Sequence, residues 1–176
     1  MITDPEFRVD TVLEIAKRMA IAARTAPKGR GKDNIEIKIA SGNDLFVIAD
    51  KMDSIGENTE QAFFLRDAGN IRNSTAVLLV GTGIKPLGLT VCGLCGLKSC
   101  ENKEKYPDVP CAFNTHDLGI AVGSAAGVAM DNRVDNRIMY SVGMAVRDLK
   151  IFPEDIRIII GIALSATSKN IFFDRK

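Results

Sequence analysis

Apolar residues recur with two different periods in the first part of the chain. Between Val9 and Arg24 they return every three or four positions, which predicts an amphipathic helix with one wide buried face. Pro27 and Gly29 then end this helix. The next segment, IEIKI at residues 35–39, alternates strictly between apolar and charged residues. This alternation predicts a half-buried strand whose three isoleucines face the core.

The remainder of the chain mixes helical periods with short apolar runs. Helices are predicted at 44–51 and 59–68, separated by a turn at Gly56, and again at 117–130 and 135–149; buried strands are predicted at 75–80 and 156–164. Residues 81–110 show no long periodic pattern and predict a long irregular loop, a kind of segment that is usually functional in a compact protein. We therefore expect one α+β domain spanning residues 1–176, with a cysteine-rich loop at 91–112 and a C-terminal segment at 113–176.

The helix predicted at 117–130 carries an unusual stripe of glycines. Gly119, Gly123 and Gly127 are spaced by four and therefore share one helix face. Each glycine weakens a helix by about 1 kcal/mol relative to alanine. The stripe thus indicates the close approach of another backbone or of a flat cofactor, and tight helix packing is the more common of these reasons.

Composition and charge narrow the classes of function. The chain has 176 residues, of which 46% are hydrophobic and 26% charged, and its formal net charge is +1. This near-neutral balance argues against nucleic acid and anionic membranes as partners. The N-terminus has no apolar run, and the longest weakly polar stretch, 118–130, is too short to span a bilayer. We therefore expect a cytoplasmic protein with reduced thiols.

The four cysteines are the most informative residues. Cys92, Cys95, Cys100 and Cys111 have the spacing C-x2-C-x4-C-x10-C, while the chain has a single histidine, which excludes a multi-histidine metal site within one chain. Four thiolates from one loop suit either tetrahedral zinc or an iron–sulfur cluster.

Two features of the loop favour a [4Fe–4S] cluster. Gly93 and Gly96 follow the first two cysteines and leave backbone amides free to point at sulfur. The apolar neighbours Val91, Leu94, Leu97 and Val109 are expected to form a shell of low dielectric constant around it. Zinc sites more often combine two C-x2-C pairs or include histidine. Zinc, free thiols and disulfides remain open as alternatives.

At these residues the sequence resembles a known family. CGLCGLKSC is similar to the CGxCGxxxC four-iron motif of an uncharacterised family described as ferredoxin-domain-containing. The resemblance extends to AARTAPKGRGKDNIEI, HDLGIAVGSAA, DNRIMYSVGMA and IALSATSKNIFFDRK and so covers most of the chain. Ala112 rather than proline follows the last cysteine, unlike the two-cluster ferredoxin motif, so this resemblance implies a single cluster.

A more distant resemblance connects the order of elements to the flavin-dependent nitroreductases. It implies an α+β fold with a mixed sheet flanked by helices, a homodimer, and FMN held at the subunit interface. The segment that matches their APS-type loop is Ala26, Pro27, Lys28, Gly29, Arg30 and Gly31. Basic residues near the C-terminus contact the FMN phosphate in that family, and Lys169 and Arg175 stand at matching places. The arginine-rich segment that opens nitroreductases has no match here.

The KGRGK segment also has a meaning apart from any resemblance. Lys28, Arg30 and Lys32 alternate with glycines, so their side chains and the backbone amides together could hold an anion. A solvated basic turn is the equally weighted alternative. His116 is expected to cap a helix start with Thr115, beside the less common role of proton shuttle.

These patterns together favour a redox function. The expected protein holds one [4Fe–4S] cluster on Cys92, Cys95, Cys100 and Cys111 and passes single electrons, with FMN as a second centre in a flavin-dependent oxidoreductase. The redox partner protein or small-molecule substrate is open. The alternatives are an electron carrier or cluster sensor without a substrate pocket, and a zinc-stabilised structural protein. Asn136 and Arg137 are further candidates for a pocket.

Overall fold

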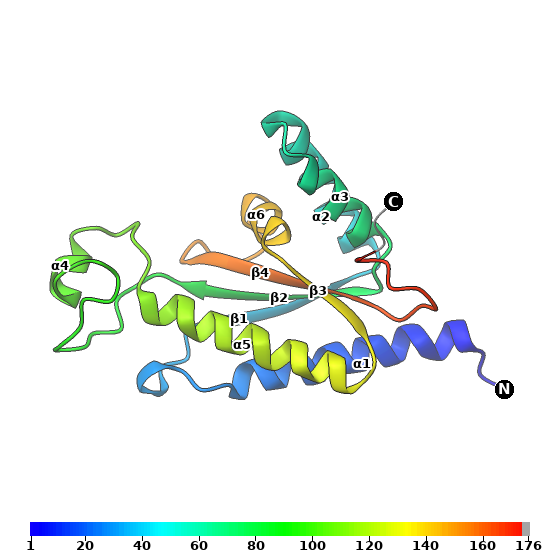
Figure 1. Ribbon diagram of the computed structural model, residues 1–176, viewed down its shortest axis with the longest axis horizontal. Helices are drawn as coiled ribbons and strands as arrows, with labels where there is room; N and C mark the ends of the chain where they lie inside the picture. Colours follow the sequence, from blue (N-terminus) through cyan, green and yellow to red (C-terminus); the bar gives the residue numbers. More distant parts are fainter. Residues whose placement is uncertain (174–176) are drawn as a thin grey trace.

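The computed structural model describes residues 1–173 as three layers, with one sheet between two layers of helices (Figure 1). The sheet contains β1 (Ile35–Ser41), β2 (Ala76–Gly83), β3 (Asp135–Met139) and β4 (Ile156–Ser165). Their spatial order is β1-β2-β4-β3. The α+β class is confirmed, and the strands predicted at 35–39, 75–80 and 156–164 are all present.

Every pairing in the described sheet is antiparallel, so the expected mixture of strand directions is wrong. β2 and β4 are the two central strands, and residues 76–82 of β2 are all buried. This explains the continuous apolar sequence of β2, because a central strand between two helical layers has no solvent face, whereas β4 has an exposed arginine, Arg157, near its start. In β1 the isoleucines at 35, 37 and 39 are the less exposed residues, as the alternation predicts.

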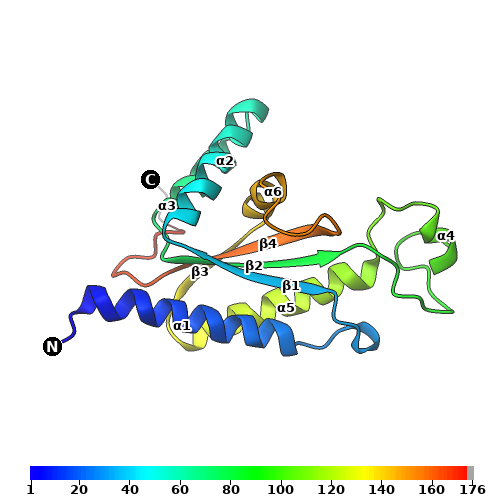
Figure 2. The same cartoon turned by 180° about the vertical axis from the view of Figure 1, so that it is seen from behind.

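One face of the sheet is covered by α1 (Asp4–Thr25) and α5 (Ala112–Asp131), which lie side by side (Figure 2). α1 begins five residues before the predicted Val9, because a capping box between Thr3 and Glu6 and a proline in the first turn start it in a polar segment. α5 begins at Ala112, with Cys111 as its N-cap residue, rather than at Asp117.

The opposite face is covered by α2 (Asn43–Thr59), α3 (Ala62–Arg72) and α6 (Tyr140–Asp148). The turn predicted at Gly56 is wrong, because this glycine is buried inside α2. A Cβ at Gly56 would lie 2.9 Å from Leu65 Cδ2, so the glycine permits α2 and α3 to pack closely. The chain turns instead at Glu60, which has a left-handed φ of 55°.

The single helix predicted at 135–149 is also wrong. Residues 135–139 form the edge strand β3 along β4, and the helix starts only at Tyr140. In a strand, alternate residues share one face. Asp135 and Arg137 therefore point to the same side of the sheet, toward the layer of α2, α3 and α6.

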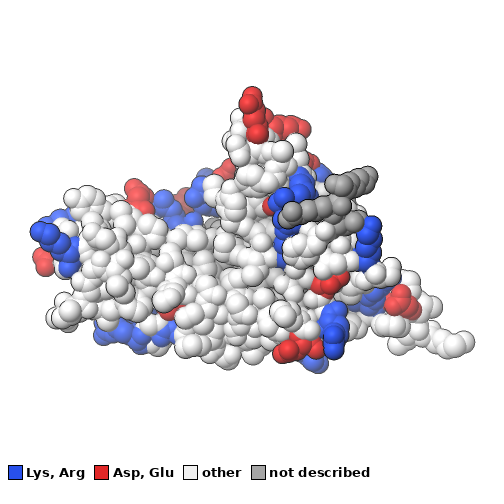
Figure 3. Space-filling view, viewed as in Figure 1, with Lys and Arg blue, Asp and Glu red and all other residues white. Residues whose placement is uncertain are grey.

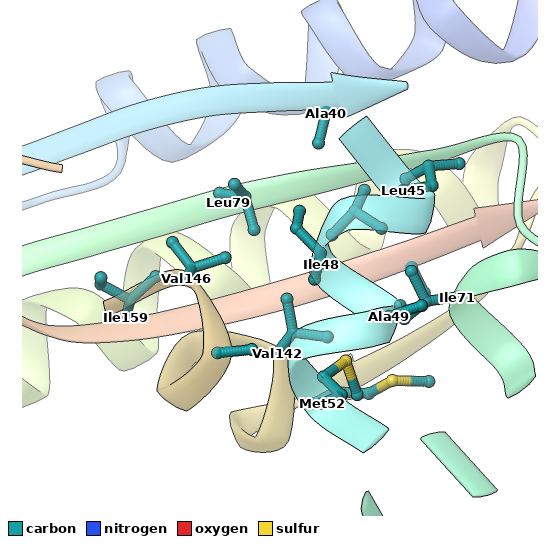
Figure 4. Packing of buried hydrophobic residues seen from close by; sticks show 14 of the residues in the cluster. Ala40, Leu45, Ile48, Ala49, Met52, Ile71, Leu79, Val142, Val146 and Ile159 are labelled. Atoms are coloured by element: carbon teal, nitrogen blue, oxygen red, sulfur yellow. The ribbon is translucent and has the colours of Figure 1, made fainter. Parts of the chain in front are cut away.

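Each face of the sheet has its own apolar core. The core under α2, α3 and α6 contains Leu45, Ile48, Met52, Val142 and Ile159 among others (Figure 4). The second core lies between the sheet and α1 and α5 and includes buried residues such as Met19, Leu78 and Ile162. The sheet with its two cores leaves residues 84–111, which include the short helix α4 (Cys100–Glu104), projecting at one end of the molecule (Figure 1). No helix within residues 1–173 is long and apolar enough to cross a membrane.

Candidate redox site

All four cysteines belong to the projecting segment 84–111, which we call the cysteine lobe. Cys92, Cys95 and Cys100 are half-buried, and Cys111 is buried at the start of α5. None of them forms a disulfide. The apolar shell expected around them is only partial, because Val91 is 91% exposed and Leu94 is 72% exposed, whereas Leu97 and Val109 are half-buried. The first two cysteines therefore lie beside an exposed apolar tip of the lobe.

Cys92 has the most distinctive surroundings of the four. Hydrogen bonds from the backbone amides of Leu94 and then Gly93 to its sulfur lower the pKa of the Cys92 thiol. Burial opposes this shift, and a weaker hydrogen bond with the Cys100 side chain adds to it. Amide hydrogen bonds to a thiolate are the interactions that stabilise metal-bound sulfur in iron–sulfur proteins. Gly93 and Gly96 have φ values of 157° and 83°, the second in the left-handed region that favours glycine.

The structure brings Cys92 and Cys100 together but does not bring all four sulfurs to one point. Among the residues that it describes, no group of three or more histidine, cysteine or acidic side chains is arranged to hold a metal ion. Four thiols are the donors that a zinc or iron–sulfur centre needs, but their sulfurs do not converge as placed, so a shared centre would require the loop to move. Coupling between metal binding and loop folding is common for sites that draw their ligands from one loop.

The base of the cysteine lobe is fixed to the sheet and to α5 by polar groups. The Cys111 amide donates to the Ile84 carbonyl at 3.3 Å. The buried Asn114 side chain donates to the carbonyls of Gly83 (3.1 Å) and Lys85 (2.8 Å), and its Oδ1 accepts from Asn34 Nδ2 at 3.2 Å. One asparagine therefore holds together the two ends of the lobe, although the lobe itself projects from the fold.

We expect Asn114→Ala to lower the free energy of unfolding by about 2 kcal/mol, because it removes three part-buried hydrogen bonds. Limited proteolysis should cut within residues 84–111 faster than in the unaltered protein. Asn132→Ala is the matched control, since Asn132 is exposed at the other end of α5 and donates only to Val128. Equal losses of stability in urea unfolding for the two variants would contradict the role assigned to Asn114.

The KGRGK segment lies beside the base of the lobe, and its donors already have partners in the protein. The Lys28 ammonium donates to the Ala23 and Ala26 carbonyls at 2.8 Å and to the Arg24 carbonyl, so it closes the C-terminal end of α1. The Gly29 amide donates to both carboxylate oxygens of the buried Asp117 at 3.0–3.1 Å. An anion at this loop would have to displace these bonds.

The other two cations of this segment reach the cysteine lobe. Arg30 Nη1 donates to the Gly88 carbonyl at 2.8 Å, and Lys32 Nζ donates to the Leu87 carbonyl at 3.3 Å. A Cβ at Gly29 would lie 2.9 Å from Leu87 Cδ2, so the glycine allows the lobe to approach this turn. In this structure the KGRGK segment is therefore hydrogen-bonded to the cysteine lobe. Anion binding by this segment stays a prediction.

The C-terminal candidates are only partly described. Lys169 lies in the segment after β4, where its carbonyl accepts a hydrogen bond from Thr167, and Arg175 lies outside the described residues. Arg137 donates to the Phe172 carbonyl at 2.6 Å and lies 3.9 Å from the buried carboxylate of Asp67. Arg137 therefore fastens the segment after β4 to α3, while Asn136 lines a shallow surface hollow with Arg133 and Asn170.

The glycine stripe of α5 faces away from the fold. A Cβ added at Gly119, Gly123 or Gly127 would meet no atom of residues 1–173 within 4 Å. Packing inside the chain is therefore not the reason for these glycines. Ile120 and Met130 on the same helix are 40% and 68% exposed. Figure 3 shows a broad area without charged side chains over α5.

Sequence reasoning missed Asn114 and Asp117 as buried polar residues of the site. Both lie near the beginning of α5, a helix rich in small residues. In the sequence they were marked only as polar side chains near the predicted start of that helix. His116 is not part of a cap: it is exposed in the second turn of α5, and Thr115 donates within that helix to Ala112. The helix starts earlier than predicted, which moves His116 away from its end.

Comparison with solved structures identifies the fold as that of the FMN-dependent nitroreductases. A nitroreductase with bound FMN from Desulfitobacterium hafniense superposes with a TM-score of 0.61 at 15% identity, covering 96% of this chain and 80% of that one. An FMN-dependent nitroreductase from Clostridium difficile superposes with a TM-score of 0.58 at 13% identity, covering 89% of this chain and 76% of that one. At these identities the likeness concerns the fold alone.

Sequence comparison identifies the family. A profile described as "Uncharacterized protein containing a ferredoxin domain (DUF2148)" matches residues 107–175. A curated relative from Archaeoglobus fulgidus, described as "Uncharacterized protein", is 38% identical and covers 99% of this chain and 97% of the relative. The chain belongs to this family of proteins containing a ferredoxin domain, as the resemblance of its sequence predicts.

Proposed function

We propose that the protein is a cytoplasmic redox protein that holds one [4Fe–4S] cluster on Cys92, Cys95, Cys100 and Cys111. The observation that carries this proposal is the cysteine lobe itself: four thiols in one projecting segment, with two backbone amides directed at the first sulfur. Such a cluster, when bound, supplies one-electron transfer. The partner is a redox protein or a small molecule that is reduced.

The chain's own residues would set the environment of this centre. The amides of Gly93 and Leu94 stabilise negative charge on Cys92. Asn114 and the Cys111 amide hold the base of the lobe, so that a movement of the loop tip leaves the buried Cys111 in place. The half-buried position of the other three cysteines leaves this centre near the surface, where an electron can reach a partner.

A flavin is the second candidate, and the fold favours it. The two solved neighbours described above are FMN proteins by title. Against it, Lys28 and the Gly29 amide are bonded to groups of this chain rather than free for a phosphate. The donors of this loop as arranged here therefore fit FMN less well than the cysteines fit a cluster, and we derive no step through a flavin.

An absorption spectrum taken on anaerobically purified protein separates these proposals. A broad brown absorption near 400 nm is expected for the cluster. The structured absorption of a yellow flavin, which denaturation releases into solution, would instead identify an FMN oxidoreductase. The spectrum of a cluster without that of a flavin would support an electron carrier or a cluster sensor rather than a flavin enzyme. A colourless protein with one zinc per chain would contradict the redox proposal and support a zinc-stabilised structural protein.

We also propose that α5 forms the contact between two copies of the chain. Its exposed glycines have open space beside them, Ile120 and Met130 are exposed on the same helix, and no charged side chain lies over this area in Figure 3. Glycines on a helix face allow a second helix to approach closely. The measured oligomeric state is therefore expected to be a dimer.

Gly123→Arg should convert this dimer to a monomer, because it places a long charged side chain in the middle of the α5 face. Light scattering coupled to gel filtration measures the mass directly. Gly69→Arg, on a helix of the opposite layer where the glycine also has open space, is the control and should leave the mass unchanged. A monomeric unaltered protein, or a dimeric Gly123→Arg variant, would contradict the α5 interface.

A further inference from the structure

A cavity of about 550 Å³ lies where the cysteine lobe meets the beginning of β4. Its apolar walls are Ile84 and Pro86, from the start of the lobe, and Pro107, after α4. Its charged residues come from both sides: Lys85, Lys103 and Glu104 from the lobe, and Glu154, Asp155 and Arg157 from the β4 side. The volume is within the range of small-molecule sites, and most of the exposed lining surface is apolar, although six of the nine lining residues carry a charge.

Lys103 distinguishes this cavity from an ordinary surface hollow. Only 2% of this residue is exposed, although lysine is almost never fully buried unless it is paired. Its ammonium has three N–H donors, and the structure gives it one acceptor, the Pro107 carbonyl at 3.5 Å. Within residues 1–173 no carboxylate lies within 4 Å of the Lys103 ammonium, so it forms no ion pair. Arg157, the cation across the cavity, is paired with Asp108. A buried cation with one long hydrogen bond lacks the negative charge that such a group needs.

We propose that this cavity is a binding site for a small organic monocarboxylate, with its carboxylate on Lys103 and its apolar body against Ile84, Pro86 and Pro107. A carboxylate would supply the acceptors and the charge that the Lys103 ammonium lacks, through charge-assisted hydrogen bonds. The cavity adjoins the cysteine lobe, so the bound molecule would lie next to the redox centre. Its role as the substrate of that centre rests on the proposed function, whereas its binding does not.

The rest of the lining favours one negative charge on the ligand rather than several. Besides Lys103 the lining carries two cations, Lys85 and Arg157, and three carboxylates, Glu104, Glu154 and Asp155, so it adds no net positive charge for a phosphate or a dicarboxylate. A small inorganic anion also has no apolar part that would contact the apolar walls of the cavity. An aromatic or branched aliphatic acid matches both features, because it combines one carboxylate with an apolar body.

Isothermal titration calorimetry with benzoate tests the proposal on the purified full-length chain. Benzoate should bind, and Lys103→Met should weaken its affinity at least tenfold, since the charge-assisted bonds are lost. Lys105→Met is the matched control, because Lys105 is exposed two residues further on, and it should bind benzoate like the unaltered protein. Benzyl alcohol, which has the same ring without the charge, should bind at least tenfold more weakly than benzoate.

Three results would overturn the proposal: no benzoate binding, equal affinity in folded Lys103→Met, or tighter binding of inorganic phosphate than of benzoate. If Lys103→Met does not fold by circular dichroism, Pro107→Trp serves instead, because it narrows the cavity from its apolar wall. Unchanged benzoate affinity in that variant would equally overturn the site. Iron measured in the same samples tests the cluster separately, so a protein that binds benzoate without iron would retain this site and lose the proposed redox centre.

Discussion

Cys95→Ser is expected to remove most of the bound iron, from about four atoms per chain to less than one after anaerobic reconstitution. Serine keeps the size of the side chain but replaces the thiolate, which is the ligand that iron–sulfur clusters require. Cys95 is half-buried on the lobe, away from both apolar cores, so the exchange should not unfold the protein. Iron analysis and the absorbance near 400 nm measure the loss.

Leu94→Ala is the matched control for this variant. Leu94 lies between the first two cysteines and is 72% exposed, so its truncation leaves all four thiols and both amides on Cys92 in place. It should retain its iron. Full iron content in Cys95→Ser would remove this cysteine from the ligand set, and an equal loss in Leu94→Ala would show that the lobe is merely sensitive to any substitution.

Gly143→Ala should have the largest effect on stability of any single methyl group added to this protein. A Cβ at Gly143 would lie 1.7 Å from the Ile159 carbonyl oxygen and 2.6 Å from its carbonyl carbon, which are backbone atoms of the central strand β4. α6 must therefore move off the sheet to accept it, and the core that contains Val142 and Ile159 would open. We expect a loss of about 3 kcal/mol or more in the free energy of unfolding.

Gly69→Ala provides the contrast for chemical denaturation. Gly69 lies within α3, and a Cβ there meets nothing within 4 Å. Alanine should raise the free energy of unfolding by about 0.5–1 kcal/mol, since it restricts the unfolded chain and favours the helix. If Gly143→Ala were as stable as the unaltered protein, the close contact between α6 and β4 would not exist as described.

The sequence pattern predicts the strands whose burial is regular, either along most of the strand or at alternate residues. The apolar runs at 75–80 and 156–164, the second of them interrupted by Arg157, become the two central strands, and the IEIKI alternation becomes β1. The edge strand β3 was missed because DNRIM has neither a run nor a clean alternation of apolar residues. Its strand conformation depends on pairing with β4, which is a tertiary contact that local sequence does not record.

The sequence likewise predicts some parts of the candidate site and not others. The spacing of the cysteines and their glycines identifies the lobe, and the family comparison confirms the ferredoxin-domain resemblance. The sequence predicts the KGRGK segment as an anion site or a solvated turn, but in the structure its three cations donate to backbone carbonyls, and the Gly29 amide donates to Asp117, which lies 88 positions later. The cavity at Lys103 had no signal in the sequence, because it forms only where the lobe meets the turn before β4.

The amount of iron and acid-labile sulfide per chain in anaerobically prepared protein tests most directly whether the four cysteines hold one [4Fe–4S] cluster. About four of each are expected per chain, with both lost in Cys95→Ser. One zinc per chain without sulfide, or unaltered protein that takes up no metal after reconstitution, would contradict it.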